Sequence, residues 1–192
     1  MTRILVIQGH PDRAGGHFGH ALAEAYGGSA RAAGHDLQEL SVAALALPPL
    51  GSRSDWEGAP PEPAREAQSA IASAEHIALF YPLWLGTMPA ALKAFLEQVL
   101  RPGFAFSYPD SGGSPKKMLR GKSARVVVTM GMPALFYRLY FGAHGVRSLE
   151  RNILRFCGIG PVRRSLIGMV EGGAGRRERW LERMRCYGAR AR

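Results

Sequence analysis

Several loops of this sequence carry groups that can bind or stabilise negative charge, and the first is GHPDRAGGH. It contains three side-chain donors and a pair of glycines, namely His10, Arg13, His17, Gly15 and Gly16. Free N–H groups at the start of a helix bind phosphate, and glycines let the backbone approach a ligand. The pattern is neither GxGxxG nor GxxxxGK[ST], which disfavours a Rossmann dinucleotide site and a P-loop NTPase. A plain strand-to-helix connection is the alternative.

The second such loop contains a histidine between small residues, in Gly142-Ala143-His144-Gly145. The flanking glycines disfavour an ordinary core role for His144. Because histidine titrates near neutral pH, it is suited to stabilise transient negative charge. Tyr137 and Tyr140 are close enough in sequence to share its site. The alternative is a histidine in a surface loop.

A third candidate region is FYPLWLGTMPAALKAFLEQVL, which reads as a strand, an apolar loop and a helix. The strand ends at Pro82, Trp84 lies in the loop, and Pro89 opens the helix, as suits a proline. Open α/β sheets bind ligands at the carboxyl ends of their strands, so Trp84 is either a wall beside a planar ligand or a core aromatic. The loop that begins at Thr129 takes the corresponding place after the next strand, where Gly131 admits a ligand or forms a turn.

Other kinds of site and compartment find little support. No Ser/His/Asp spacing or HExxH motif favours hydrolysis, and the two cysteines, Cys157 and Cys186, lack the spacing of a metal site or a disulfide framework. Cys157 falls on the inward face of a helix that we expect Ser148 to cap and Gly158 to end. The first apolar run is too short for a signal peptide, and none approaches the roughly 18 residues of a membrane span. We therefore expect no metal and a cytoplasmic protein.

The chain is strongly basic, with a formal net charge of +10 and many arginines near its C-terminus. Such a tail is suited to contact nucleic acid or an acidic membrane surface. However, an apolar stripe at helical spacing separates these arginines, formed by Trp180, Leu181, Met184 and Tyr187. This pattern is typical of a surface helix with a solvated basic face. Without base-stacking aromatics or a recognised motif, we expect no nucleic-acid partner.

The elements that must position these loops alternate between strands and helices. Short apolar runs predict strands at residues 3–9, 35–42, 77–81, 123–130 and 162–170. Helical spacing predicts helices at residues 18–34, 64–74, 89–99, 148–157 and 175–187. This alternation predicts a three-layer α/β sandwich, in which helices cover both faces of a five-stranded parallel sheet within one domain, residues 1–192. We favour the flavodoxin-like order 2-1-3-4-5, with a crevice between the first and third strands.

Together these segments resemble the flavodoxin-like NAD(P)H:quinone oxidoreductase family over nearly the whole chain. GHPD…HFGHALAEAY is similar to its phosphate loop and first helix, and FYPLWLGTMPAALKAFLEQVL is similar to its Pro-Leu-Trp flavin loop, which is the most specific match. TMGM stands where the family commonly has a Thr-Thr-Gly-Gly type loop, and GAHGVRSLERNILRFCGI resembles the segment with its active-site histidine. A shorter relative is the flavin-containing ancillary subunit of bacterial potassium-efflux systems, itself a quinone reductase.

The resemblance implies FMN, with FAD as the alternative, and NAD(P)H as co-substrate. The cofactor-binding residues that it implies are His10, His17, Phe18, Pro82, Leu83, Trp84, Leu85, Thr129, Met130 and Gly131. It also implies that His144 is the catalytic histidine, with Tyr137 as its tyrosine partner and Tyr140 as the alternative. The chain departs from the family where Gly16-His17 replaces the usual serine and where Met130 and Met132 replace smaller residues.

The reaction that the resemblance implies is ping-pong hydride transfer. NAD(P)H passes hydride to flavin N5 and leaves, and a quinone then takes its place and receives the hydride. His144 with Tyr137 would stabilise the charge that develops near flavin N1 and O2. A homodimer with both chains lining each site is also implied, with Trp56 and residues 104–108 as candidate contributors. The alternative function is a regulatory flavoprotein subunit docked on a membrane potassium-efflux transporter, a peripheral membrane partner that the basic tail and the long loop at residues 45–63 favour.

Overall fold

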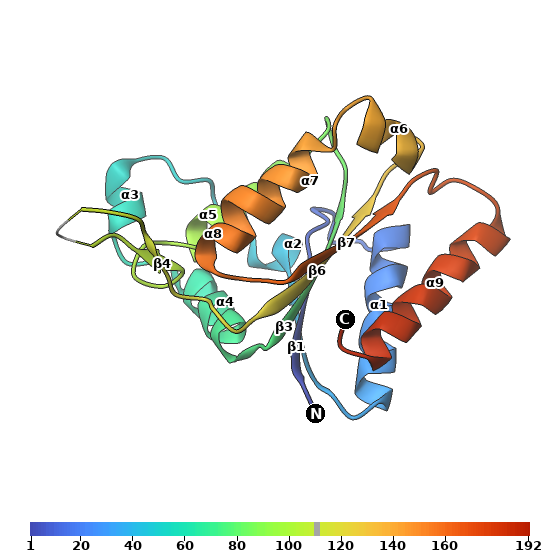
Figure 1. The fold of residues 1–192 in the computed structure, drawn as a ribbon, viewed down its shortest axis with the longest axis horizontal. Coiled ribbons are helices and arrows are strands. Elements are labelled where there is room, and N and C mark those ends of the chain that lie inside the picture. The colour runs from blue at the N-terminus through green and yellow to red at the C-terminus, as the bar shows by residue number, and fades with distance from the viewer. Residues whose placement is uncertain (110–111) are drawn as a thin grey trace.

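A five-stranded parallel sheet forms the centre of the molecule (Figure 1). The computed structural model describes residues 1–109 and 112–192. From edge to edge the sheet consists of β2 (Asp36–Ser41), β1 (Arg3–Gln8), β3 (His76–Pro82), β6 (Ser123–Thr129) and β7 (Val162–Ile167). Each neighbouring pair is parallel. The three middle strands are apolar and almost wholly buried, as strands covered on both faces must be, which confirms the predicted α/β architecture.

Helices cover both faces of this sheet, which makes three layers (Figure 1). One face carries α1 (Phe18–Ala32) and α9 (Ala174–Ala189), which pack against each other. The other face carries α2 (Val42–Leu45), α4 (Glu62–Ser73), α5 (Ala90–Val99) and a continuous helical segment made of α7 (His144–Ser148), the π-helical η1 (Leu149–Leu154) and α8 (Arg155–Cys157). Alternate side chains of each strand feed two separate hydrophobic clusters, so that Leu5 and Ile7 face one layer while Ile4 and Val6 face the other.

The predicted order 2-1-3-4-5 is wrong in detail, because the chain adds two short strands between β3 and β6. These strands, β4 (Phe106–Ser107) and β5 (Lys116–Lys117), pair with each other in an antiparallel ribbon outside the main sheet. The last two strands of the main sheet are therefore β6 and β7. The ribbon lies in the segment predicted to be irregular, residues 104–121, of which 110 and 111 lie outside the described residues. The long loop at residues 45–63 likewise contains a short helix, α3 (Arg53–Glu57).

The helix after the Gly-Ala-His-Gly loop begins earlier than its sequence suggests. Ser148 was the predicted N-cap, but it has helical dihedral angles (φ −62°, ψ −49°) inside the continuous segment that starts at His144. The helical turn is hidden in the sequence because His144 lies between glycines, which are poor helix formers. The predicted end of the helix is confirmed, since Gly158 adopts a left-handed conformation at φ +104° and Cys157 is buried.

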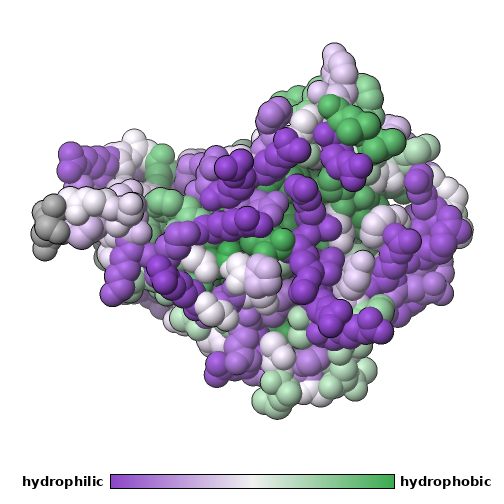
Figure 2. All heavy atoms as spheres, viewed as in Figure 1, coloured by the Kyte–Doolittle hydropathy of each residue, from purple (hydrophilic) through white to green (hydrophobic). Residues whose placement is uncertain are grey.

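The arginine-rich C-terminal helix packs through its apolar stripe, as predicted. Met184 is fully buried, and Trp180, Leu181 and Tyr187 pack around it against α1 and the sheet. Its arginines form much of the polar surface at that side of the molecule (Figure 2). In the part of the chain that the structure describes, no helix is long and apolar enough to cross a membrane.

The close contact between α1 and α9 predicts a contrast between two glycines. A Cβ at Gly188 of α9 would overlap the Tyr26 carbonyl oxygen and Ser29 Oγ of α1, whereas a Cβ at Gly28 would meet no atom within 4 Å. We expect Gly188→Ala to lower the free energy of unfolding by about 2 kcal/mol or more, because the helices must separate. The control Gly28→Ala should raise it by about 0.5–1 kcal/mol, because alanine favours a helix. Urea titrations of both variants test this, and equal effects would contradict the close packing.

Candidate active site

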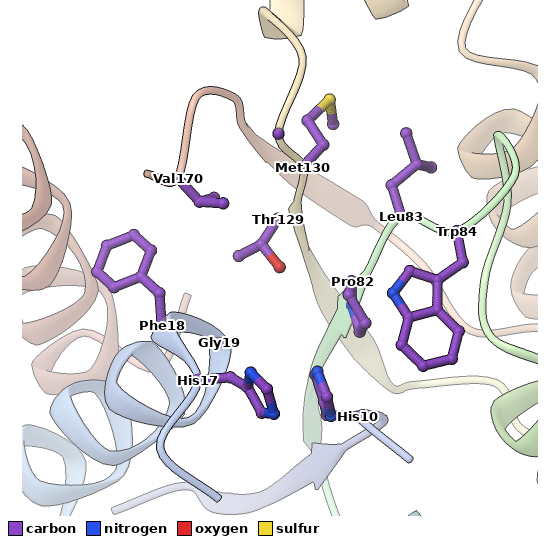
Figure 3. Close-up of a pocket in the computed structure, with 11 residues that line it drawn as sticks. His10, His17, Phe18, Gly19, Pro82, Leu83, Trp84, Thr129, Met130 and Val170 are labelled. Carbon is purple, nitrogen blue, oxygen red and sulfur yellow. The ribbon is translucent and has the colours of Figure 1, made fainter. Parts of the chain in front are cut away.

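Three loops leave the sheet side by side at its carboxyl edge because backbone hydrogen bonds continue past the strand ends. Gly9 N donates to Phe80 O at 2.7 Å, and Leu83 N donates to Thr129 O at 2.7 Å. Between them lies a pocket of about 210 Å³, which Figure 3 shows in close-up. The residues that line it are His10, His17, Phe18, Gly19, Pro82, Leu83, Trp84, Thr129, Met130, Gly131 and Val170.

The pocket contains nine of the ten residues that were predicted to bind the cofactor. The tenth, Leu85, does not line it. Leu85 projects fully into solvent from a tight turn, where it has a positive φ of +47°. Its neighbour Trp84 is half exposed and faces the pocket. The Trp84 and His10 rings are nearly perpendicular, and their centroids are 5.9 Å apart. The geometry therefore favours Trp84 as a pocket wall over a core aromatic.

Two stacked imidazoles form the other side of the pocket (Figure 3). The rings of His10 and His17 lie 4.0 Å apart by centroid distance and are nearly parallel. His17 Nε2 lies 2.7 Å from Asp12 Oδ2, and Ala14 N donates to Asp12 Oδ1 at 2.8 Å. These hydrogen bonds, the one with His17 first, lower the pKa of the Asp12 carboxyl. The loop that supplies these hydrogen-bond donors therefore also carries an anion of its own, the exposed carboxylate of Asp12.

The first turn of α1 presents unoccupied backbone donors to the pocket. The N-cap residue His17 makes no side-chain hydrogen bond to the helix, and the first turn contains no acidic residue. The first N–H groups of a helix have no partner within it, so they remain available to an anion. A Cβ on Gly131 would meet no atom within 4 Å, which leaves open space opposite this turn. These features fit a phosphate group beside α1 and a flat ring near Trp84.

Tyr137 joins the His144 helix to the Trp84 turn. It belongs to α6 (Ala134–Leu139), and burial raises the pKa of its hydroxyl. This hydroxyl donates to Gly86 O at 3.1 Å and accepts from Val146 N at 3.4 Å. At the same contact Gly145 packs directly against Gly86, with no space for a side chain.

His144 lies next to this contact and not in the pocket lining. Its side chain is exposed, and its ring lies over Gly142. Tyr140, the alternative partner, is exposed and stacks on Phe136 at 4.9 Å between ring centroids. Of the two tyrosines, Tyr137 is the one that the structure ties to the histidine helix.

Three residues at this site were not predicted from the sequence. Gly19 and Val170 line the pocket, and His20 lies one turn along α1 from His17 with its ring 5.2 Å from that of His10. Their sequence signals were weak. The spacing of His17 and His20 places them on the same side of a helix start, but Val170 enters only because the chain after β7 folds back, where Val170 N donates to Met130 O at 3.3 Å.

Comparison with known proteins agrees with this geometry. A family model described as the flavodoxin-like fold matches residues 2–187. An FMN-dependent NADH:quinone oxidoreductase of Ruegeria pomeroyi is 34% identical over 149 residues, which cover 69% of this chain and 72% of that protein. NAD(P)H dehydrogenase [quinone] 1 of Rattus norvegicus is 26% identical and covers 87% of this chain and 69% of its own.

Among solved structures, an NAD(P)H:quinone oxidoreductase from Methanothermobacter marburgensis superposes with a TM-score of 0.83 at 24% identity, covering 98% of each chain. An FMN-dependent NADH-azoreductase from Bacillus anthracis, solved in complex with FMN, superposes with a TM-score of 0.76 at 16% identity, covering 99% of each chain. At these identities the superpositions establish the fold. With the family match and the sequence relatives, the chain belongs to the flavodoxin-like fold family that includes the NAD(P)H:quinone oxidoreductases.

Proposed function

We propose that the protein is an FMN-dependent NAD(P)H:quinone oxidoreductase. One observation carries this conclusion, namely that the pocket combines unoccupied N–H donors at the start of α1 with an apolar wall at Pro82, Leu83 and Trp84. Sequence relatives named as FMN-dependent NADH:quinone oxidoreductases support the same activity. None of the relatives described above has a name that indicates a regulatory role on a potassium-efflux transporter.

Different residues of the pocket would bind the phosphate and the ring of the cofactor. His10, His17 and the first turn of α1 would bind the phosphate, because donors and the helix dipole favour an anion there. Trp84 and its neighbours would support the ring, and the chain at Thr129 and Gly131 would border it. FMN, when bound, supplies the two-electron hydride chemistry. NAD(P)H and the quinone would bind in turn at the exposed side of the pocket.

His144 is proposed to be the catalytic residue. Its exposed imidazole belongs to the helix that packs on the Trp84 turn, so it lies beside the apolar wall. There it would donate a hydrogen bond to negative charge that develops during reduction. Tyr137 uses its hydroxyl to bridge Gly86 and Val146, so we assign it a positioning role.

A homodimer is also part of the proposal. Aromatic side chains line an apolar groove of about 270 Å³ between α5, β4 and α8, among them Trp56, Phe106, Tyr108 and Phe156. Tyr108 is largely exposed although its ring packs edge-on against Phe106. Exposed aromatic surfaces of this kind are typical of protein interfaces, and a partner chain would bury them.

The activity predicts two separable half-reactions. Purified protein loaded with FMN should lose its flavin absorbance when NADH or NADPH is added without oxygen, and a quinone should restore it. A useful control is Gly131→Phe, whose side chain would fill the open space of the pocket and should weaken FMN binding at least about tenfold. An FMN-loaded protein that NAD(P)H does not reduce, or a reduced one that quinone does not reoxidise, would rule out the proposed activity.

The role of His144 predicts a loss of rate without a loss of cofactor. We expect His144→Ala to slow the reductive half-reaction about a hundredfold, the usual contribution of such a group, and to leave the Kd for FMN within about twofold. Tyr137→Phe should give a smaller loss with a raised KM, because the helix is displaced and the imidazole is retained. Arg147→Ala, exposed on the same helix, is the control. Stopped-flow rates and FMN titrations separate these effects, and a normal rate for His144→Ala would exclude the catalytic role.

The proposed dimer predicts a position-dependent effect of added charge. Tyr108→Glu places a carboxylate in the aromatic groove and should weaken dimerisation more than about tenfold. Gln38→Glu puts the same charge on an exposed polar position of the edge strand β2, outside the groove, and is the control. Sedimentation velocity over a range of concentrations distinguishes monomer from dimer. A wild-type monomer at every concentration would refute the dimer, and equal effects of both changes would refute this interface.

A further inference from the structure

Three histidines surround the start of α1, together with one acidic side chain. The ring of His20 lies 5.2 Å from that of His10 and 5.6 Å from that of His17, measured between centroids. The Asp12 carboxylate bonds only His17 among the three imidazoles, by the 2.7 Å contact already described. Within the described ranges, no group of three or more His, Cys, Asp or Glu side chains has a geometry that could hold a metal. The cluster therefore needs another explanation.

The hydrogen bonds distinguish the three imidazoles. His10 Nδ1 accepts a hydrogen bond from Asp12 N at 3.1 Å, so this nitrogen carries no proton and neutral His10 has its proton on Nε2. His17 is paired with Asp12. His20 Nδ1 is buried and has no hydrogen-bond partner among the described residues. Protonation of His10 Nδ1 would break its bond with Asp12 N, whereas the His20 ring makes no hydrogen bond with the described residues and can take up a proton without losing a partner.

Burial and neighbouring charges disfavour the charged forms of His10 and His20 while no anion is bound. Burial first, and then His17, lower the pKa of His20, while Asp12 raises it. Burial, His17 and His20 lower the pKa of His10, which Asp12 also raises. The guanidinium of Arg13 is directed to another loop, where its Nε donates to the Ala43 carbonyl at 2.7 Å. An incoming phosphate would approach the Asp12 carboxylate, and a proton taken up by a nearby histidine would reduce the repulsion between the two anions.

We propose that the protein takes up a proton on His20 when it binds the phosphate of FMN. This inference rests on the proposed function, since it concerns how the same pocket holds its cofactor. The proton comes from solvent and binds the free imidazole nitrogen, and no covalent bond to the cofactor forms or breaks. Protonated His20 offsets the charge of Asp12, so a dianion is accepted beside an acidic side chain that otherwise repels it.

The coupling has a definite sign with pH. A histidine that is neutral in the free protein and charged in the complex binds a proton between its two pKa values. The affinity for FMN should therefore rise as the pH falls from about 8.5 to about 6.5, a range in which the phosphate, with its second pKa near 6, stays mostly a dianion. Uptake of one proton corresponds to at most about a tenfold change in Kd per pH unit. Riboflavin, which lacks the phosphate, should show no such trend.

Titration calorimetry of the purified full-length protein with FMN tests this, in buffers of different ionisation enthalpy near pH 7. We expect an uptake of about half to one proton per FMN in the wild type, and close to none with riboflavin or in His20→Asn. His35→Asn is the matched control, because His35 lies at the far end of α1 and accepts its hydrogen bond from Thr2 N. Asp12→Asn should bind FMN more tightly than the wild type near pH 8.5, since it removes the repulsion and keeps an acceptor for Ala14 N.

The outcomes distinguish a failure of the His20 proposal from a failure of the proposed oxidoreductase function. Binding of FMN without proton uptake in the wild type would overturn the role of His20 and leave the oxidoreductase intact. The same conclusion follows if His20→Asn, shown to be folded by its circular dichroism, takes up protons as the wild type does. Failure of the wild type to bind FMN at every pH would instead contradict the proposed function together with the inference.

Discussion

Two backbone hydrogen bonds at the carboxyl edge of the sheet fix the relative positions of the three loops that line the pocket. The bonds from Gly9 N to Phe80 O and from Leu83 N to Thr129 O continue the register of β1, β3 and β6 into their loops. The first needs a glycine, because a Cβ on Gly9 would lie 2.9 Å from Leu92 Cδ2 and 3.0 Å from Phe80 O. Loops fixed in this way can present donors and an apolar wall to one ligand without further ordering, which is the condition for tight binding.

The second level of organisation is the contact between the Trp84 turn and the His144 helix. Gly86 and Gly145 meet with no room for a side chain on Gly145, and the Tyr137 hydroxyl donates to Gly86 O and accepts from Val146 N. A histidine on an exposed loop would sample many positions, whereas here the helix that carries it is held against the pocket wall. The π-helical turn η1 follows directly on α7 in the same helical segment, and such turns are frequent at functional sites.

The charged groups that attract an anionic ligand at long range differ from the groups that line the pocket. The net charge of +10 resides largely in exposed arginines, many of them on α9, and it draws anionic nucleotides toward the molecule at long range. The pocket itself is lined by His10 and His17 and lies at the start of α1, with the Asp12 carboxylate beside His17. A neutral imidazole costs less free energy to desolvate than a guanidinium group with its fixed charge, which suits histidines to a partly buried pocket.

Nine of the pocket residues followed from the resemblance of the loops to those of the quinone oxidoreductase family. The sequence by itself also determined the parallel α/β sandwich and the main helices, because buried strands and amphipathic helices have distinct periods. It did not reveal the outward turn of Leu85, the helical start at His144, or the β4–β5 ribbon. The turn at Leu85 is closed locally, by hydrogen bonds between Trp84 and Thr87. The helical start at His144 instead lies at a contact between segments far apart in the chain, Gly145 against Gly86, and such contacts override local preference. The choice of Tyr137 over Tyr140 and the meeting of His20 with His10 are likewise tertiary facts, because only the folded chain sets which side chains are neighbours.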